Sequence, residues 1–357
     1  MAAQRWLRGR LLIAGSWILC RLPERPLIRA AELAGDLWYR AAPERAGQAR
    51  RNLRRVAEAL AASGRGPAAV HAAATDGRVL ERLVRRAFRH AALYYLEVAR
   101  TPGIRPRDLD ERLLIETPDV VAEAFTPGRA SIFLGLHFGA IELPALYLAS
   151  RVGDAVAPME TIDDPALQAW FIRTRGAAGV RIVGLHEARR ELLAALRAGT
   201  SVGLVGDRDL TGGGTLTPLF GLPALLPLGP AMLAVESGAP MFAVGARRAG
   251  IGRYRGRLVP VPVPADGTRR ERVTGTMTAI AAAFEEIVAD APEQWWAVFF
   301  PIWPDLEGAS LDDPAGPPDA ATGVSSVGRT SPVVPPGPVV PPGPTVPPGP
   351  AAPPGPA

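Results

Sequence analysis

A histidine and a glutamate five residues apart form the pair of side chains best suited to acid–base chemistry in this sequence. His137 follows the apolar run Ser131–Leu136, and Glu142 stands in the first turn of a helix expected to begin near Ala140. Near neutral pH a histidine can take the proton of an alcohol, and a carboxylate on its other ring nitrogen stabilises the imidazolium that forms. The pattern predicts a His137–Glu142 dyad for an ester-forming transfer. A core histidine satisfied by the backbone is the alternative.

The elements that must position this pair alternate between short apolar runs and amphipathic stretches. Such alternation predicts an α/β fold with a central, mostly parallel sheet flanked by helices, and the continuously apolar strands fit a sheet covered on both faces. His137 would then lie at the carboxyl end of a strand, where open α/β sheets bind ligands. The expected strands are Ser131–Leu136, Ala155–Met159, Val180–Val183, Val202–Gly206, Met241–Ala246 and Leu258–Val263. The expected helices between them are Glu142–Ser150, Ala166–Ala178, Glu187–Arg197, Pro230–Ser237 and Arg269–Asp290.

The first hundred residues have a different character and read as helical. Helices are expected at Pro26–Arg40, Pro43–Ala62 and Asp76–Arg100, with a Gly/Ala-rich loop at Ser63–Ala74. Proline is favoured in the first turn of a helix, which suits Pro26 and Pro43.

The N-terminal segment combines positive charge with apolar residues. Residues 1–60 hold 12 Arg and 5 acidic residues, and the ten apolar or small residues 11–20 lie between Arg10 and Arg21. A bilayer-spanning helix needs about 20 apolar residues, so residues 1–22 are predicted to form a helix lying in the membrane interface. A buried N-terminal helix is the alternative. The apolar stretch favours a lipid surface over nucleic acid as the partner of the arginines.

Composition limits the remaining possibilities. Apolar residues make up 48% of the 357 residues and charged residues 21%, so the chain can bury a sizeable core. Beyond residue 305 proline and glycine dominate, and a VVPPGP-type unit repeats every six residues, which excludes the three-residue period of collagen. The expected organisation is an interfacial helix at 1–22, a catalytic domain at 23–305 and a disordered, Pro/Gly-rich tail at 306–357.

Several motifs fail in their context. Ser201 lies in a G-x-S-x-G pattern, but the expected helix precedes it and the strand follows, the reverse of a nucleophile elbow. Cys20 is the single cysteine, so no disulfide framework or cysteine metal site can form. The four histidines have no metal-ligand spacing, and neither a metal nor another cofactor is expected.

An ordered series of blocks resembles the bacterial lysophospholipid and lipid A acyltransferase superfamily. Residues 136–143, LHFGAIEL, are similar to its H-F-G-x-x-E-L block and carry its H-x4-D/E motif. Later blocks are Met159-Glu160 with residues 171–176, the acid–base–acid cluster at 207–209, residues 218–234, and the P-x-Q-W ending at 292–296. The resemblance covers roughly residues 5–304 and implies a glycerol-3-phosphate acyltransferase-like fold.

The resemblance also implies roles for individual residues. Glu160 and Arg175 would form an ion pair that shapes the acceptor pocket. Asp207, Arg208 and Asp209 would line the cleft beside the dyad. The backbone N–H groups at Gly229-Pro230 would bind a phosphate or an oxyanion, and Arg247 with Arg248 would meet the donor's phosphates. The full set of expected site residues is His137, Glu142, Glu160, Arg175, Asp207, Arg208, Asp209, Gly229, Pro230 and Arg247.

The resemblance is nearer to the phosphatidylinositol mannoside acyltransferases than to the lipid A enzymes, because of the Asp-Arg-Asp cluster and the closing Phe-Pro-Ile-Trp-Pro at 300–304. Glu142 departs from the aspartate more usual in that branch. The implied reaction moves a fatty acyl chain from acyl-CoA or acyl carrier protein to a membrane glycolipid hydroxyl, at the cytoplasmic face of the cell membrane. The alternatives are a lipid A acyltransferase, a thioesterase or lipase, and a non-catalytic lipid-binding protein.

Overall fold

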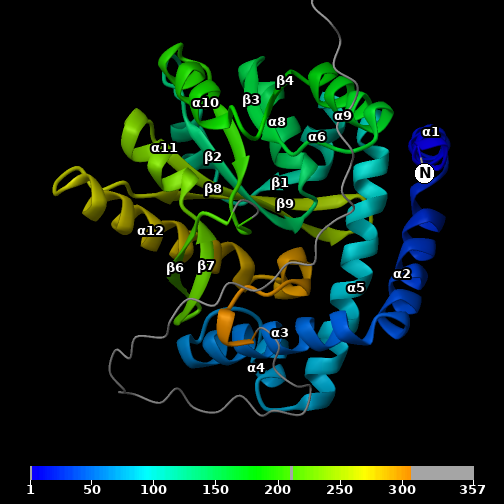
Figure 1. Cartoon of the computed structure of the whole chain (residues 1–357). Helices are drawn as coiled ribbons and strands as arrows, with labels where there is room; N and C mark the ends of the chain where they lie inside the picture. The colour runs from blue at the N-terminus through cyan, green and yellow to red at the C-terminus, as the bar shows by residue number, and fades with distance from the viewer. Residues whose placement is uncertain (1, 210–211, 307–357) are drawn as a thin grey trace, which may run out of the picture. The chain divides into compact units, whose positions relative to one another are not determined.

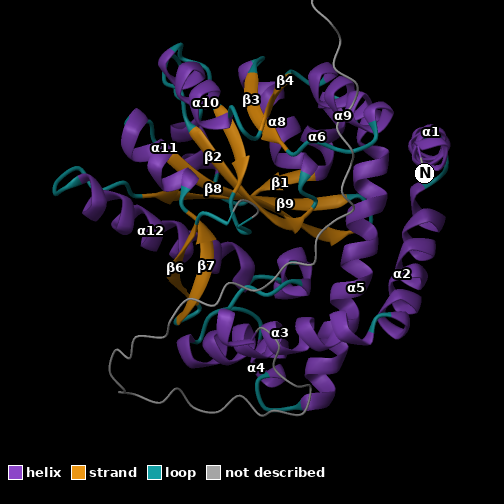
Figure 2. Cartoon of the chain, in the orientation of Figure 1, coloured by secondary structure: helices purple, strands orange, loops and turns teal. Residues whose placement is uncertain are grey.

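The computed structural model describes residues 2–209 and 212–306, with only the backbone considered at 2–8 and 106. Its centre is a seven-stranded sheet of order β1-β9-β8-β2-β5-β3-β4 (Figures 1 and 2). All neighbouring strands are parallel except β8 and β9, which form an antiparallel pair. The predicted α/β class with a mostly parallel sheet is confirmed. The strands are β1 (Leu113–Ile115), β2 (Ile132–Gly139), β3 (Ala155–Met159), β4 (Val180–Gly184), β5 (Val202–Val205), β8 (Met241–Gly250) and β9 (Arg253–Val261).

Helices cover both faces of this sheet. One face packs against α10 (Ala188–Arg197), α11 (Gly229–Ser237) and α12 (Arg269–Ala289), whose apolar residues join the main core. The other face carries α7 (Pro118–Ala124), α8 (Glu142–Val152) and α9 (Pro165–Ala177). A short α6 (Pro106–Arg112) contacts α8. The predicted helices between the strands all occur, with ends that differ by a few residues.

The described part of the first hundred residues forms five helices: α1 (Ala2–Leu19), α2 (Glu24–Ala41), α3 (Pro43–Ser63), α4 (Ala68–Ala73) and α5 (Gly77–Arg100). The predicted helical N-terminal region is therefore present, although α4 lies within the segment expected to be a loop. Helix α5 runs beside both α1 and α2 (Figure 1). The Ser16 hydroxyl donates to the Ala99 carbonyl at 2.6 Å, which fixes α1 on α5.

A small antiparallel hairpin, β6 (Gly214–Leu219) and β7 (Leu222–Pro227), lies outside the main sheet and was not expected. Its two-residue turn has positive φ at both Phe220 (51°) and Gly221 (78°), the conformation of a tight hairpin turn.

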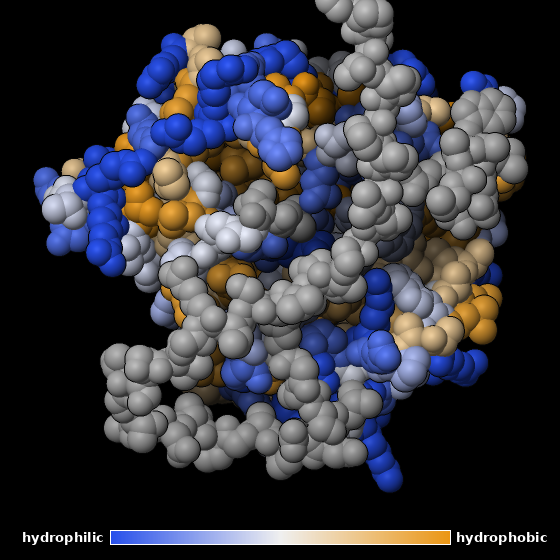
Figure 3. Space-filling view, viewed as in Figure 1, coloured by the Kyte–Doolittle hydropathy of each residue, from blue (hydrophilic) through white to orange (hydrophobic). Residues whose placement is uncertain are grey.

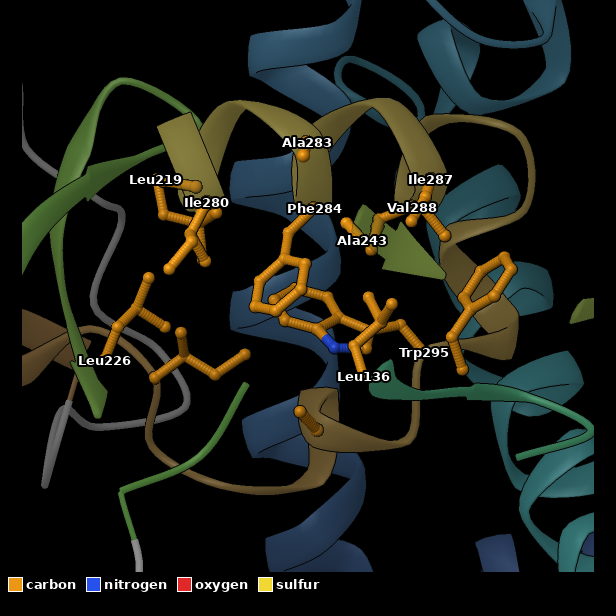
Figure 4. Packing of buried hydrophobic residues seen from close by; sticks show 14 of the residues in the cluster. Leu136, Leu219, Leu226, Ala243, Ile280, Ala283, Phe284, Ile287, Val288 and Trp295 are labelled. Carbon is orange, nitrogen blue, oxygen red and sulfur yellow. The ribbon is translucent and has the colours of Figure 1, made fainter. Parts of the chain in front are cut away.

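The main core lies between the sheet, α12 and the chain's last described segment. Figure 4 shows side chains of α12, among them Phe284 and Ile287, gathered around Leu136 and the indole of Trp295. Trp295 is 1% exposed although it belongs to an irregular segment of short 3-10 turns, η2 (Pro292–Gln294), η3 (Trp296–Phe299) and η4 (Pro304–Leu306). Leu306 is itself buried, whereas residues 307–357 of the predicted tail lie outside the described residues.

Candidate active site

Strand β2 sorts its side chains onto two faces because successive residues of a strand point to opposite sides. Ile132, Leu134 and Leu136 belong to the main core with α10–α12. Phe133 and His137 line a cavity on the other face, beneath α8 and α9. His137 comes near the end of this strand, so its ring stands at the mouth of the cavity with 18% of the side chain exposed.

The carboxylate that holds the ring is that of Asp207, not that of Glu142. Asp207 follows β5, the parallel neighbour of β2, and its Oδ1 lies 2.7 Å from His137 Nδ1. Its Oδ2 accepts the backbone N–H of His137 at 2.9 Å and the Trp295 indole N–H at 2.9 Å. Burial raises the pKa of Asp207, but its contacts with His137 and Trp295 outweigh burial, so the net pKa is lowered. The carboxyl stays ionised and can only accept hydrogen bonds.

This geometry sets the tautomer of the histidine. Because the Asp207 carboxylate is an acceptor, Nδ1 carries the proton and Nε2 keeps a lone pair. Within the described residues, no protein group hydrogen-bonds to Nε2. A neutral imidazole held in this way is ready to accept a proton from a bound hydroxyl, and its protonated form would face a buried negative charge.

Glu142 lies in the same cavity but has a different partner. Its Oε1 is 2.6 Å from an Arg175 Nη, and its Oε2 accepts Arg175 Nε–H at 3.3 Å. The backbone turns sharply before it at Gly139, where φ is +55° and an added Cβ would lie 2.1 Å from the Ala246 carbonyl oxygen. The expected His137–Glu142 contact is therefore wrong, because the turn directs Glu142 toward α9.

The same ion pair corrects the expected partner of Glu160. Arg175 pairs with Glu142 instead, and Glu160 is exposed at the rim of the cavity. Burial lowers the pKa of Arg175, but Glu142 more than compensates, so the net pKa is raised and the guanidinium stays charged. The negative charge of Glu160 instead acts on Arg208, which also lines the cavity, and favours its charged form.

Arg208 is held by aromatic rings. Its guanidinium carbon lies 3.7 Å from the ring centroid of Phe300 and 5.3 Å from that of Trp296. Trp296 also packs against the His137 ring, with centroids 5.4 Å apart. Burial lowers the pKa of Arg208, with Asp207 and Glu160 opposing the shift. The result is a cation beside the His137 ring at the cavity mouth, as expected from the sequence.

The other predicted site residues lie elsewhere. Asp209 accepts the backbone N–H groups of Gly212 and Gly214 at 3.0 and 2.7 Å, so it shapes a turn and does not line the cavity. Gly229 and Pro230 begin α11 and do not line the cavity, so the expected role of their backbone N–H groups stays a prediction. Arg247 is paired with Glu116 at 2.6 Å and Asp290 at 3.5 Å, away from the cavity.

The Arg248 side chain is buried in contacts with the protein, so it is not available to the donor's phosphates as expected. Its side chain is 7% exposed, and it bonds Glu97 at 2.5 Å and the Gly139 carbonyl at 2.9 Å. Gln294 brackets the backbone of Arg248, accepting its N–H at 2.8 Å and donating to its carbonyl at 3.0 Å. Gln294 thus positions Arg248, whose side chain bonds the turn after His137. Trp295 donates to the Asp207 carboxylate. The sequence signalled these two residues only as part of the P-x-Q-W block, without indicating their contacts.

The cavity itself has a volume of about 360 Å³ and an apolar interior. Its charged groups, Glu142, Glu160, Arg175 and Arg208, gather with His137 at the carboxyl ends of the strands, whereas the deeper wall is aliphatic and aromatic. An apolar cavity with a few convergent polar groups is typical of a small-molecule site. The arrangement suits a substrate with a long hydrocarbon part and a reactive group beside His137.

Comparison with known proteins agrees with this chemistry. Residues 2–300 match the family described as bacterial lipid A biosynthesis acyltransferase. The chain is 28% identical over 288 residues to a phosphatidylinositol mannoside acyltransferase of Mycolicibacterium smegmatis, covering 79% of this chain and 87% of that protein. It is 30% identical over 208 residues to a phosphatidylinositol mannoside acyltransferase of Mycobacterium tuberculosis, covering 57% and 64%. The chain is therefore an acyltransferase, an enzyme that belongs to the bacterial lipid A biosynthesis acyltransferase family.

Proposed function

We propose that the enzyme transfers a fatty acyl chain from acyl-CoA or acyl carrier protein to a hydroxyl of a phosphatidylinositol mannoside-type glycolipid. The observation that carries the chemistry is the His137–Asp207 pair at the mouth of an apolar cavity. The proposed acceptor is supported by the two mycobacterial relatives, whose identity to this chain is 28% and 30%.

The proposed reaction is a direct transfer. His137 Nε2 takes the proton of the acceptor hydroxyl as its oxygen attacks the thioester carbonyl, and Asp207 stabilises the imidazolium. The tetrahedral intermediate collapses, the carbon–sulfur bond breaks, and the thiolate takes the proton from the imidazolium. Arg208, placed over Trp296 beside the ring, provides positive charge near the developing oxyanion or the donor's phosphates.

A membrane surface is the proposed location of the reaction. Figure 3 shows apolar residues on the outer side of α2, where Leu33 and Leu37 are 65% and 64% exposed. They follow each other by one helical turn. Helix α1 also exposes large apolar side chains: Leu11, Leu12, Trp17 and Ile18. Within the described part of the chain, no helix is long and apolar enough to span a bilayer. We propose a peripheral association through α1 and α2 at the cytoplasmic face of the cell membrane.

The activity is tested by acyl transfer with purified protein, comparing the wild type with His137→Ala. Labelled palmitoyl-CoA is offered with phosphatidylinositol mannoside, with a lipid A precursor, or with no acceptor. Product that depends on the mannoside and falls at least about a hundred-fold in the variant supports the proposal. Transfer only to the lipid A precursor would show that the acceptor is of the lipid A type. Hydrolysis of the thioester without an acceptor would indicate a thioesterase. Activity unchanged in the variant would refute the role of His137.

Membrane association has its own test. The double variant Leu33→Asp, Leu37→Asp should lose binding to anionic vesicles, because it places charge on the apolar face. Leu216→Asp is the matched control, since Leu216 is 60% exposed on β6. Equal vesicle binding by both variants would contradict the proposed surface.

A further inference from the structure

We infer that Phe133 and Leu148 form a wall that sets the length of the acyl chain the enzyme accepts. The inference rests on the proposed function, because it assigns the donor's hydrocarbon chain to the cavity beneath α8. Beyond that function, the inference identifies Phe133 and Leu148 as the end of this cavity and a smaller cavity as the space behind them.

The floor of the cavity is open where two strands lack side chains. Gly203 on β5 lies opposite Phe133 on β2, and Gly135 lies opposite Val205. Both glycines line the cavity. A Cβ added at Gly203 would find its nearest neighbour, Leu148 Cδ2, at 3.7 Å, and one at Gly135 would find the Leu204 carbonyl oxygen at 3.6 Å. These are ordinary contacts, so neither glycine is required by the fold. A glycine inside a strand often marks close approach of a ligand.

The cavity runs along β2 from the catalytic ring to its deep end. His137 and Phe133 are four residues apart, which corresponds to about 13 Å along a strand. A polypeptide has three backbone bonds in about 3.5 Å when extended, so 13 Å matches an extended alkyl chain of about eleven bonds. A chain whose carbonyl lies at His137 would therefore reach Phe133 at about its twelfth carbon, and a longer chain must bend or displace the wall.

A second, smaller cavity lies directly behind this wall. It has a volume of about 20 Å³ and continues beneath α8 toward β9 and β1. Five residues line both cavities: Phe133, Pro144, Leu148, Val244 and Gly245. Phe133 also packs against Phe125, another residue of the smaller cavity, with ring centroids 5.1 Å apart. The two spaces are thus parts of one groove that these side chains divide.

The smaller cavity fits hydrocarbon rather than a polar group. Within the described residues its lining carries no charged side chain, and it is built from aliphatic and aromatic residues with two glycines. Its volume is too small for a chain of any length unless Phe133 or Leu148 moves. Shortening either side chain should join the two spaces and admit the end of a longer chain.

The test measures kcat/KM for thioester donors from octanoyl to stearoyl with wild type, Phe133→Leu and Gly203→Ala. Each methylene that becomes buried improves binding about four-fold, so Phe133→Leu should raise the stearoyl-to-lauroyl ratio on the order of ten-fold. Gly203→Ala adds a methyl group to the floor and should move the ratio in the opposite direction. Equilibrium binding of the matching non-hydrolysable acyl thioethers should follow the same order without turnover.

Phe242→Leu is the matched control. Phe242 lies opposite Phe133 in the strand register and is also buried, but it lines neither cavity. It should leave the chain-length ratio unchanged. A ratio that Phe133→Leu does not change, or that Phe242→Leu changes equally, would overturn the wall while leaving the acyltransferase intact. If the wild type transferred no acyl group from any donor, the proposed function would fail, and the binding series would still decide whether the wall exists.

Discussion

Two buried carboxylates lie near the His137 ring, and they differ in whether a permanent positive charge already neutralises them. Asp207 accepts hydrogen bonds from the His137 ring and from the Trp295 indole N–H, and both donors are neutral while the ring is neutral. Its hydrogen-bond partners therefore carry a positive charge only when the ring is protonated. Glu142 is already neutralised by Arg175, whose guanidinium is always charged. The first pair can therefore stabilise a charge that appears during the reaction, whereas the second fixes the shape of the cavity before substrate arrives.

The comparison also shows how the fold selects partners. Glu142 is five residues from His137, but the helix start turns it away. Asp207 is 70 residues from His137 and still reaches it, because β5 is the parallel neighbour of β2. Strand order in the sheet, rather than distance along the chain, decides which acid holds the ring.

The strongest test of this division is Asp207→Asn. Asparagine has one oxygen and one NH2 group where Asp207 has two oxygens, so it cannot accept hydrogen bonds from both His137 Nδ1 and the Trp295 indole. The variant no longer fixes the ring's tautomer, and it lacks the negative charge that stabilises the imidazolium. We expect kcat to fall about a thousand-fold, as expected for an orienting carboxylate. Steady-state kinetics on the folded variant measures this loss, and an unchanged kcat would assign the ring's control to another group.

Glu142→Gln should behave differently. It leaves the Arg175 charge uncompensated, and we expect the free energy of unfolding to fall by about 2 kcal/mol, less than for a fully buried pair. Activity should fall about ten- to a hundred-fold, mainly through KM. The double variant Glu142→Gln, Arg175→Gln should recover stability in denaturant unfolding. A loss of kcat equal to that of Asp207→Asn would abolish the distinction between the two acids.

Trp295→Phe is a finer test of the first pair. It removes the indole N–H from Asp207 but keeps most of the packing, and a hydrogen bond to a charged group contributes about 1.5–3 kcal/mol. We expect kcat to fall about ten-fold. Trp303→Phe is the control, because the Trp303 indole is also buried but donates to the Leu219 carbonyl, outside the site. It should lower the melting temperature without lowering kcat per folded molecule; equal losses of kcat would mean that Trp295 acts only through stability.

The smallest effect on activity is expected far from the cavity, at Asp36. Hydrogen bonds from Arg85 and Arg89 hold the pKa of Asp36 well below its ordinary value of 3.8. Because the folded-state pKa is lowered, this contact stabilises the fold above about pH 4, and the contribution is lost as the pH falls further. Asp36→Asn should lower the free energy of unfolding by about 1 kcal/mol at pH 7, since both arginines are partly exposed, and by less at pH 3. Transfer activity should not change; a large loss would show that α2 influences the site.

Much of the fold could be predicted because its signals are local. The strands on either side of the site are short apolar runs, and the helices between them have clear starts, so their ranges needed only small adjustments. The hairpin β6–β7 was missed because Pro218 and Pro223 interrupt it, and proline argues against a strand. Strand β1 spans Leu113–Ile115, too short for a periodic pattern.

The sequence predicted which residues line the cavity better than it predicted which of them contact one another. His137, Glu142, Glu160, Arg175 and Arg208 do line one cavity, as expected from their sequence blocks. Their pairing was not predictable, because it depends on the strand order and on the turn at Gly139. Gly229, Pro230 and Arg247 were assigned to the site from resemblance alone, and none of the three lines the cavity.

The segment that carries Gln294 and Trp295 has a consequence for how the enzyme is made. Every group proposed to react is synthesised by residue 208, yet Trp295, which donates to Asp207 and pairs with the backbone of Phe138, is 88 residues beyond Asp207. Domains generally form as the chain leaves the ribosome, N-terminal parts first. A nascent chain that has not yet released this segment would hold its histidine and its carboxylate without the contacts that align them. Alignment of the pair would then come only after residue 295 has left the ribosome, when α1 and α2 have long been available to a membrane.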